Sequence, residues 1–422
     1  MRKIGLQNLI NIPLRALTLA GKFSVIFFMA KYLKPEDFSL YGLLAATIAY
    51  SLYIVSFEFS NYTTRELIAQ PTSSWGKILK SHAYFILLLY IIFTPTIIYL
   101  FGANLLPDGY LYWFLLVLFL EHLFQETAKL LIADTLVFEA NMVIFMGHGL
   151  WPILASICMV LLPDARVVSF VLSCWICGAA LSCAFGLIFI KKLNLGGWDS
   201  PVRWDFIKAG IAIAFPLLLC TLALRGILTL DRYLVLSFHG KDILASYVLY
   251  VGVAAAMLSL LEASLFYPFY PRLIKCFKNG SIQQHRKMVK TFFSYCVVFV
   301  LVTSAIALLA MHTLVSFIDK DVYVDNLSMF RWILLAFCFY CLSMVPHYAL
   351  YSQGKDKPLL FINLSAIVCF AVAIYFIRSL TENSTSLNTV PLGLVFSFFI
   401  LFLMKSYAYI YLQSGSGFVR NG

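Results

Sequence analysis

Apolar residues fill runs of about 20 residues along nearly the whole chain, and short polar stretches separate these runs. A helix of that length is what crosses the hydrocarbon core of a bilayer. The pattern predicts an all-α integral membrane protein with about twelve transmembrane helices. The expected spans lie near residues 11–31, 40–59, 82–102, 111–131, 141–162, 167–190, 210–236, 243–266, 291–317, 329–351, 358–378 and 389–411.

A repeated pattern divides the expected spans into two halves. Each copy contains an acidic turn, a tyrosine that opens a span and a glutamate near the end of that span; the matched pairs are Tyr41 with Tyr247 and Glu58 with Glu262. About half the chain and six spans separate the copies, so the halves are expected to run parallel. The sequence therefore predicts an N-terminal six-helix lobe at 1-190, a cytoplasmic linker at 191-208 and a C-terminal six-helix lobe at 209-422.

Two expected spans carry polar residues at helical spacing. The stripe in the first span is Asn11, Arg15, Thr18 and Lys22, and the stripe in the seventh is Thr221, Arg225, Thr229 and Arg232. Residues three and four apart share one face of a helix. Charge inside hydrocarbon costs several kcal/mol, so these faces should meet protein or water. We therefore expect Arg15, Lys22 and Arg225 to line a cavity.

The fourth expected span contains an ionisable cluster. His122, Glu126 and Lys129 share one helix face, while Glu121 pairs with Gln125 on another. Carboxylates beside histidine titrate near neutral pH when they are buried, which is typical of a proton or sodium relay. A salt-bridged structural cluster is the alternative, and Lys129 favours it. The candidate ion-coupling residues are Glu121, His122 and Glu126.

Three further carboxylates are candidate gates: Glu58, Asp231 and Glu262. Glu58 and Glu262 could pair with Arg15 or with basic loops, although interfacial carboxylates are often only solvated. Asp231 precedes Arg232, and we expect it at the lip of the cavity. His148 and His347 each stand alone in apolar segments, where a satisfied core histidine is the simpler interpretation.

Composition supports a membrane protein, since 62% of the residues are hydrophobic and 12% are charged. Most Lys and Arg residues of the loops fall on the side of the termini, which predicts cytoplasmic termini. The net charge of +11 is then explained by topology and by contact with anionic membrane lipids, without nucleic acid. Nearly all ten cysteines lie in apolar spans, so we expect packing rather than disulfides or metal sites.

No nucleotide-binding, metal-ligand or nucleophile motif occurs in the loops, so we expect a transporter without a cofactor and not an enzyme. Several motifs resemble those of a known transporter family: YLKPEDFSLYGLL, NYTTREL, LDRYLVLSFHGKDILASYVLY, YPRL and SQGKDKPLLFIN. Together they cover nearly the whole chain. They resemble the polysaccharide-transport family, the Wzx-type flippases of the multidrug/oligosaccharidyl-lipid/polysaccharide exporter superfamily.

The resemblance implies two lobes forming a V around a cationic central cavity in the bacterial inner membrane. It also implies that an undecaprenyl-diphosphate-linked oligosaccharide, a repeat unit of O-antigen, lipopolysaccharide or capsule, is moved to the outer leaflet by alternating access. A diphosphate needs guanidinium or ammonium partners, so the resemblance implies that Arg15, Lys22 and Arg225 of the two stripes bind the substrate. A glycan polymerase and other assembly proteins are the expected partners. Two alternatives stay open: a small-molecule or drug antiporter of the same superfamily, and a polytopic glycan polymerase.

Overall fold

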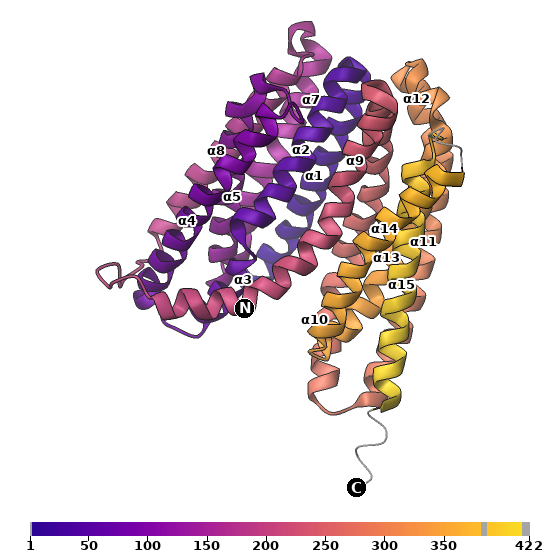
Figure 1. Ribbon diagram of the computed structural model, residues 1–422. Helices are drawn as coiled ribbons and strands as arrows, with labels where there is room; N and C mark the ends of the chain where they lie inside the picture. The colour runs from indigo at the N-terminus through magenta and orange to yellow at the C-terminus, as the bar shows by residue number, and fades with distance from the viewer. Residues whose placement is uncertain (1, 381–385, 416–422) are drawn as a thin grey trace. The chain divides into compact units, whose positions relative to one another are not determined.

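The computed structural model describes residues 2–380 and 386–415, and the regular structure in these ranges is helical. The all-α fold class is therefore confirmed. The chain forms two compact units, Met1–Leu218 and Leu219–Gly422. Figure 1 shows the helices of each unit. The helices of the N-terminal unit are α1 (Arg2–Tyr32), α2 (Pro35–Ser56), α3 (Phe59–Ile68), α4 (Trp75–Gly102), α5 (Leu111–Ala133), α6 (Val137–Phe145), the π-helical turn η3 (Met146–Leu150), α7 (Trp151–Leu161) and α8 (Val168–Lys191).

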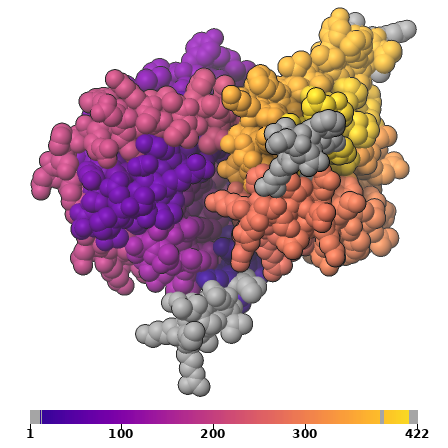
Figure 2. Space-filling model, turned by 90° about the horizontal axis from the view of Figure 1, so that it is seen from below, coloured from indigo at the N-terminus to yellow at the C-terminus, as the bar shows by residue number. Residues whose placement is uncertain are grey.

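The C-terminal unit begins inside a long helix. This helix is α9 (Trp204–Leu261), and it is followed by the π-helical turn η5 (Glu262–Phe266), α10 (Tyr267–Lys278), α11 (Ile282–Ile318), α12 (Asp321–Asp325), α13 (Leu327–Ser352), α14 (Asp356–Leu380) and α15 (Thr389–Gly415). Helix α10 is amphipathic and basic. It lies at the end of the C-terminal unit that faces the viewer in Figure 2.

Ten segments of the described chain are long and apolar enough to cross a membrane. The two further spans expected from the sequence correspond to α5 and to part of α9. The 23-residue helix α5 contains Glu121, Glu126 and Lys129, so it is less apolar than the others. The seventh expected span lies in α9, and the eighth begins in α9 and ends with η5. Helix α9 changes direction at Gly240, where φ is 82°. Glycine adopts this backbone conformation without a steric penalty. Twelve membrane helices are consistent with this arrangement.

Many large apolar side chains stay exposed on these helices, for example Leu309 of α11 and Phe361 of α14. Only 17% of the apolar window in α11 is buried inside the protein. An apolar helix that is not covered by protein is stable in lipid but not in water, where so large an apolar surface would aggregate. The protein is therefore a multi-pass membrane protein.

The expected linker between the halves packs on the N-terminal unit. The amide of Gly76, at the start of α4, donates to the carbonyl of Gly196 over 2.7 Å. Lys80 Nζ donates to the carbonyls of Trp198 and Ser200, both over 3.1 Å. A Cβ on Gly76 would lie 2.5 Å from the Gly196 oxygen, so glycine is needed for this close approach. The linker is thus fixed to α4, and the boundary between the compact units lies further along, within α9.

Hydrogen bonds fix the short helix α12 to the C-terminal unit. Ser246 Oγ donates to the carbonyl of Val322 over 2.8 Å, and the hydroxyl of Tyr250 donates to the carbonyl of Tyr323. The adjoining Lys320 is half-buried, and desolvation of its ammonium lowers its pKa to about 8. The connection between α11 and α13 is therefore an ordered, packed element.

Candidate functional site

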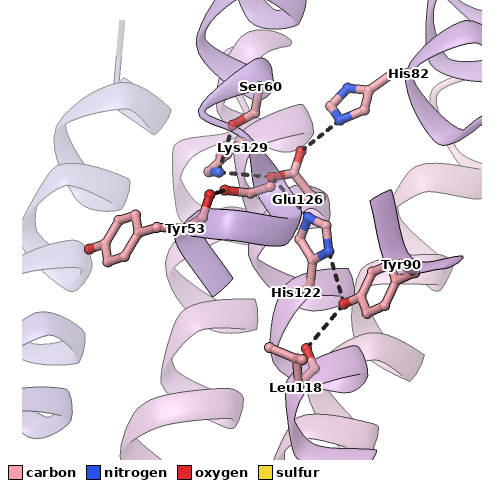
Figure 3. A network of polar contacts seen from close by, with 9 residues as sticks. Tyr53, Ser60, His82, Tyr90, Leu118, His122, Glu126 and Lys129 are labelled. Carbon is pink, nitrogen blue, oxygen red and sulfur yellow. Dashed lines mark hydrogen bonds and ion pairs between the residues drawn. The ribbon is translucent and has the colours of Figure 1, made fainter. Parts of the chain in front are cut away.

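The side chain of Glu126 on α5 lies at the centre of a polar network in the N-terminal unit (Figure 3). Its Oε1 accepts a hydrogen bond from Lys129 Nζ at 2.8 Å and lies 3.8 Å from His122 Nε2. Its Oε2 lies 3.7 Å from His82 Nε2 on α4. Lys129 also donates to Ser60 Oγ on α3 over 2.7 Å. One carboxylate thus faces three groups that carry or accept a proton, and only 22% of its side chain is exposed.

His122 connects this network to α4. Its Nδ1 lies 3.1 Å from the hydroxyl oxygen of Tyr90, while its buried Nε2 has no hydrogen-bond partner within 3.5 Å. If His122 Nδ1 donates its proton to the hydroxyl oxygen of Tyr90, Nε2 of the neutral ring carries a lone pair. This lone pair faces the carboxylate of Glu126, which would repel it. One proton on either Nε2 or Glu126 removes that repulsion. The geometry therefore allows one proton to be held between His122 and Glu126.

A break between α2 and α3 brings Ser60 to Lys129. Phe57 and Glu58 both have left-handed backbone conformations, with φ values of 54° and 53°. Such a conformation costs an L-residue about 1–2 kcal/mol. Packing offsets this cost, because Phe57 and Phe59 both contact the ring of Phe85 on α4, with centroid distances of 5.5 and 4.6 Å. The strained break thus sets the direction of α3 and the position of Ser60.

Glu121 forms a second buried cluster on another face of α5. Its Oε2 accepts from Trp175 Nε1 of α8 over 3.3 Å, and its Oε1 accepts from Gln125 Nε2 over 3.4 Å. The same Oε1 lies 3.4 Å from His148 Nδ1. The pairing of Glu121 with Gln125 is confirmed. The interpretation of His148 as a satisfied core histidine agrees with this contact, and the partner that satisfies it comes from another helix.

The π-helical turn η3 explains the position of His148. A Cβ on Gly147 would lie 2.6 Å from the ring of Phe124, so only glycine permits this packing against α5. Gly21 of α1 permits a close approach to this turn, since a Cβ on Gly21 would lie 2.6 Å from the Gly149 carbonyl oxygen, and a Cβ on Gly149 would lie 3.0 Å from the Cα of Thr18 on α1. π-Turns are rare and occur often at functional sites. Here the turn brings α1, α5 and His148 together.

Sequence reasoning missed His82, Tyr90 and Trp175, which complete the two clusters. All three lie in apolar runs of α4 and α8, far from α5 in the sequence. His82 could have been noticed as an ionisable residue near the start of an apolar span. Nothing in the local pattern of Tyr90 or Trp175 distinguishes them from packing residues.

The polar stripe of α1 lies against α6. Arg15 Nε donates to Asn141 Oδ1 over 3.3 Å, and Asn141 Nδ2 donates to Asn11 Oδ1 over 2.9 Å. The side chains of Arg15 and Lys22 are exposed although they belong to an expected span. This exposure agrees with a stripe that faces a cavity, and binding of substrate there stays a prediction.

The stripe of α9 contains a buried ion pair as well as Arg225. Arg225 is half-buried, and its carbonyl accepts a hydrogen bond from Thr229 Oγ1 over 3.0 Å. Arg232 Nη1 lies 3.4 Å from Asp231 Oδ1. Asp231 is fully buried, and its Oδ2 accepts from the hydroxyl of Tyr247 over 2.7 Å. Asp231 therefore does not lie at an exposed lip, and its expected role as a gate stays a prediction.

The other two candidate gates mark irregular helix positions in both halves. Glu58 lies at the strained break before α3, and its Oε2 accepts from Asn61 Nδ2 over 2.7 Å. Glu262 is the first residue of the π-helical turn η5. Both residues are half-buried. The repeat therefore places these two carboxylates at corresponding interruptions of a membrane helix.

No protein-family model and no curated protein matches the chain. Solved structures match over nearly its full length. An inward-facing conformation of a multidrug resistance MATE family transporter of the MOP superfamily has a TM-score of 0.75 at 12% identity, with coverage of 94% of this chain and 96% of that chain. The outward-facing conformation of such a transporter has a TM-score of 0.62 at 13% identity, with coverage of 96% and 95%. The MATE transporter ClbM in complex with Rb+ has a TM-score of 0.53 at 15% identity, with coverage of 93% and 94%.

At these identities the similarity concerns the fold. The chain has the fold of MATE transporters, which agrees with the all-helical membrane fold expected from the sequence. A shared fold does not identify the substrate, so it does not distinguish a Wzx-type flippase from other transporters. The structural neighbours are described as multidrug resistance transporters.

Proposed function

We propose that the protein is an ion-coupled transporter that works by alternating access and that Glu126 binds the coupling proton. The observation that carries this proposal is the placement of Glu126 between His82, His122 and Lys129. Protonation of Glu126 would cancel its attraction for Lys129, whose ammonium would keep its bond to Ser60 on α3. Binding a proton would thus release Lys129 from Glu126 within α5 while its contact with α3 stays, which is a local change that coupling could use.

A proton fits this site better than sodium. Lys129 Nζ lies 2.8 Å from Glu126 Oε1 and already supplies a cation to the carboxylate. A sodium ion would have to displace that ammonium, whereas a proton can enter at His122 or Glu126 without displacing a group. An alkali-metal ion such as sodium is the alternative coupling ion, because the structural neighbour ClbM was solved in complex with Rb+.

For the substrate, we propose an undecaprenyl-diphosphate-linked oligosaccharide that moves from the cytoplasmic to the outer leaflet of a bacterial inner membrane. The exposed Arg15 and Lys22 of α1 and the half-buried Arg225 of α9 support an anionic substrate. Guanidinium and ammonium groups bind phosphate through charge-assisted hydrogen bonds, which are strong away from bulk water. Partner proteins of glycan assembly would receive the product at the outer leaflet.

Small-molecule antiport is the second candidate, and the described function of the structural neighbours favours it. Purified protein in liposomes separates the two candidates. We expect a fluorescent polyprenyl-diphosphate-linked N-acetylglucosamine to become accessible to a membrane-impermeant quencher in a pH-gradient-dependent way. Ethidium should show no gradient-dependent movement. Ethidium transport without movement of the lipid would establish the antiporter and overturn the flippase.

The proposed orientation, with both termini cytoplasmic, is tested separately. Two reporter fusions test this orientation, one after Gly422, which lies outside the described residues, and one at Lys320 in the α11–α12 loop. They should report opposite compartments, because the three helices α13, α14 and α15 cross the membrane between them. Alkaline phosphatase should be active at Lys320 and green fluorescent protein should be fluorescent at Gly422. Equal signals at both positions would contradict the topology.

A further inference from the structure

A lysine is buried inside the C-terminal unit. Lys405 on α15 is 0% exposed, and its Nζ has no hydrogen-bond partner. It follows the apolar segment from Phe398 to Met404. An ammonium in such surroundings is destabilised by several kcal/mol unless it is paired. Lys405 therefore either loses its proton or has its charge compensated.

Two more buried polar atoms without partners lie on the neighbouring helices. They are Nδ1 of His347 on α13 and Oδ1 of Asn363 on α14. An amide oxygen only accepts hydrogen bonds, and the imidazole Nδ1 accepts when the proton is on Nε2. A lysine ammonium only donates. These three groups are therefore complementary when Lys405 is protonated.

Contacts of neighbouring residues indicate that the three residues lie at the same level of adjoining helices. Tyr340 and Phe398 have ring centroids 4.9 Å apart, and His347 and Lys405 each follow these residues by two helical turns on α13 and α15. Because α14 connects them, α13 and α15 run parallel, so this register holds two turns further on. Lys405 is also close enough to His347 to affect it electrostatically.

Asn363 joins the same group through α9. Its side chain lies near the thiol of Cys220, and that thiol also lies near enough to Lys405 to interact with it electrostatically. Ser365 Oγ on α14 lies 3.3 Å from Met404 Sδ, which places the turn after Asn363 beside the residue that precedes Lys405. Four helices, α9, α13, α14 and α15, therefore enclose one cluster.

Two other ionisable groups near this cluster, Asp356 and His285, lie away from Lys405 in the described part of the chain. On α14, the carboxylate of Asp356 reaches Cys220 electrostatically, but it precedes Asn363 by about 10 Å of helix rise. On α11, the ring of His285 contacts the ring of Tyr409, which lies one helical turn after Lys405 on α15. His285 Nε2 lies 3.0 Å from Ser352 Oγ. Each of these groups thus has surroundings of its own.

We propose that Lys405, His347 and Asn363 form a proton-binding site within the C-terminal unit, where the Lys405 amine takes up and releases one proton. The ammonium donates to Asn363 Oδ1 and His347 Nδ1, directly or through one water molecule. On release, the proton passes to water and leaves a neutral amine. This site belongs to a different unit from Glu126, so it does not rest on the function proposed above.

The test is the pH dependence of thermal unfolding, measured by intrinsic fluorescence on the full chain in lipid nanodiscs between pH 6 and pH 9. Protonation places a charge in apolar surroundings, so acidification should lower the melting temperature of the wild type. Lys405→Met should be the more stable protein at pH 6, by about 3 °C or more, and this difference should shrink towards pH 9. The exposed Lys355 gives the matched control, and Lys355→Met should follow the wild type.

An isosteric variant tests the geometry. Asn363→Asp places a carboxylate beside Lys405 and should hold its proton, so the pH dependence attributed to Lys405 should disappear while the protein is stabilised at pH 6. The same substitution in the Lys405→Met background should destabilise, since the new carboxylate then lacks its cation. Glu126→Gln should leave the Lys405-dependent difference intact.

Two outcomes would overturn the proposal. One is a parallel pair of pH profiles for the wild type and Lys405→Met, because Lys405 would then exchange no proton in this range. The other is a difference that follows the replacement of chloride by gluconate at constant pH, because the cluster would then be an anion site. If Lys405→Met does not yield monodisperse protein, Asn363→Asp in the wild-type background decides, and an unchanged pH profile rejects the site.

Discussion

Substituting glutamine for Glu126 is expected to reduce gradient-driven transport to the level of protein-free liposomes while leaving the amount of folded protein unchanged. The amide is nearly isosteric, and it can still accept the hydrogen bond from Lys129 Nζ that spans 2.8 Å in the wild type. It cannot bind or release a proton near neutral pH. The measurement is movement of the fluorescent polyprenyl-diphosphate lipid, or of ethidium, with and without an imposed pH gradient.

Controls separate coupling from folding in this experiment. Glu36 is exposed at the start of α2, so Glu36→Gln is a matched change that should transport normally. His122→Gln should weaken coupling less than Glu126→Gln, since His82 and Lys129 still face the carboxylate. Normal gradient-driven transport by Glu126→Gln would show that the network is a structural salt bridge, the alternative that Lys129 favours.

The second large effect is expected at Arg225. Replacing Arg225 by alanine removes both the charge and the planar fork of donors, whereas lysine keeps the charge and loses the bidentate geometry. One charge-assisted hydrogen bond contributes about 1.5–3 kcal/mol, so loss of the contact should weaken binding of a diphosphate about ten- to a hundredfold. Lysine should be intermediate. Lys22→Ala should act in the same direction, and the double variant should abolish movement of the lipid.

The measurement for Arg225 is the initial rate of lipid movement at several lipid densities, normalised to monodisperse protein. Arg232 provides a contrasting variant, because it pairs with the buried Asp231. Arg232→Ala should reduce the yield of folded protein, since it leaves a buried carboxylate without its partner. Unchanged rates in Arg225→Ala, Lys22→Ala and the double variant would remove these residues from the substrate pathway.

The polar stripes show how far helical periodicity reaches. The spacing of Thr221, Arg225, Thr229 and Arg232 puts them on one face, but it cannot show which arginine is already paired. Asp231 is adjacent in sequence and therefore points to another side of the helix by pattern alone. In the fold, Tyr247 from beyond the Gly240 break donates to Asp231 and fixes it inside the unit. The burial of that carboxylate is a tertiary property.

The sequence by itself determined the membrane-spanning all-α fold, because span length and apolar composition are set by the thickness of the bilayer and need no partner segment. It also identified the two faces of α5 that carry Glu121 and Glu126, since i, i+4 neighbours are fixed by helix geometry. Only the tertiary structure decided which distant groups complete those faces. His82, Tyr90, His148 and Trp175 come from other helices, and the complete burial of Lys405 on α15 likewise depends on the helices that pack around it. Such pairings depend on helix packing and on turns such as η3, which local spacing does not encode.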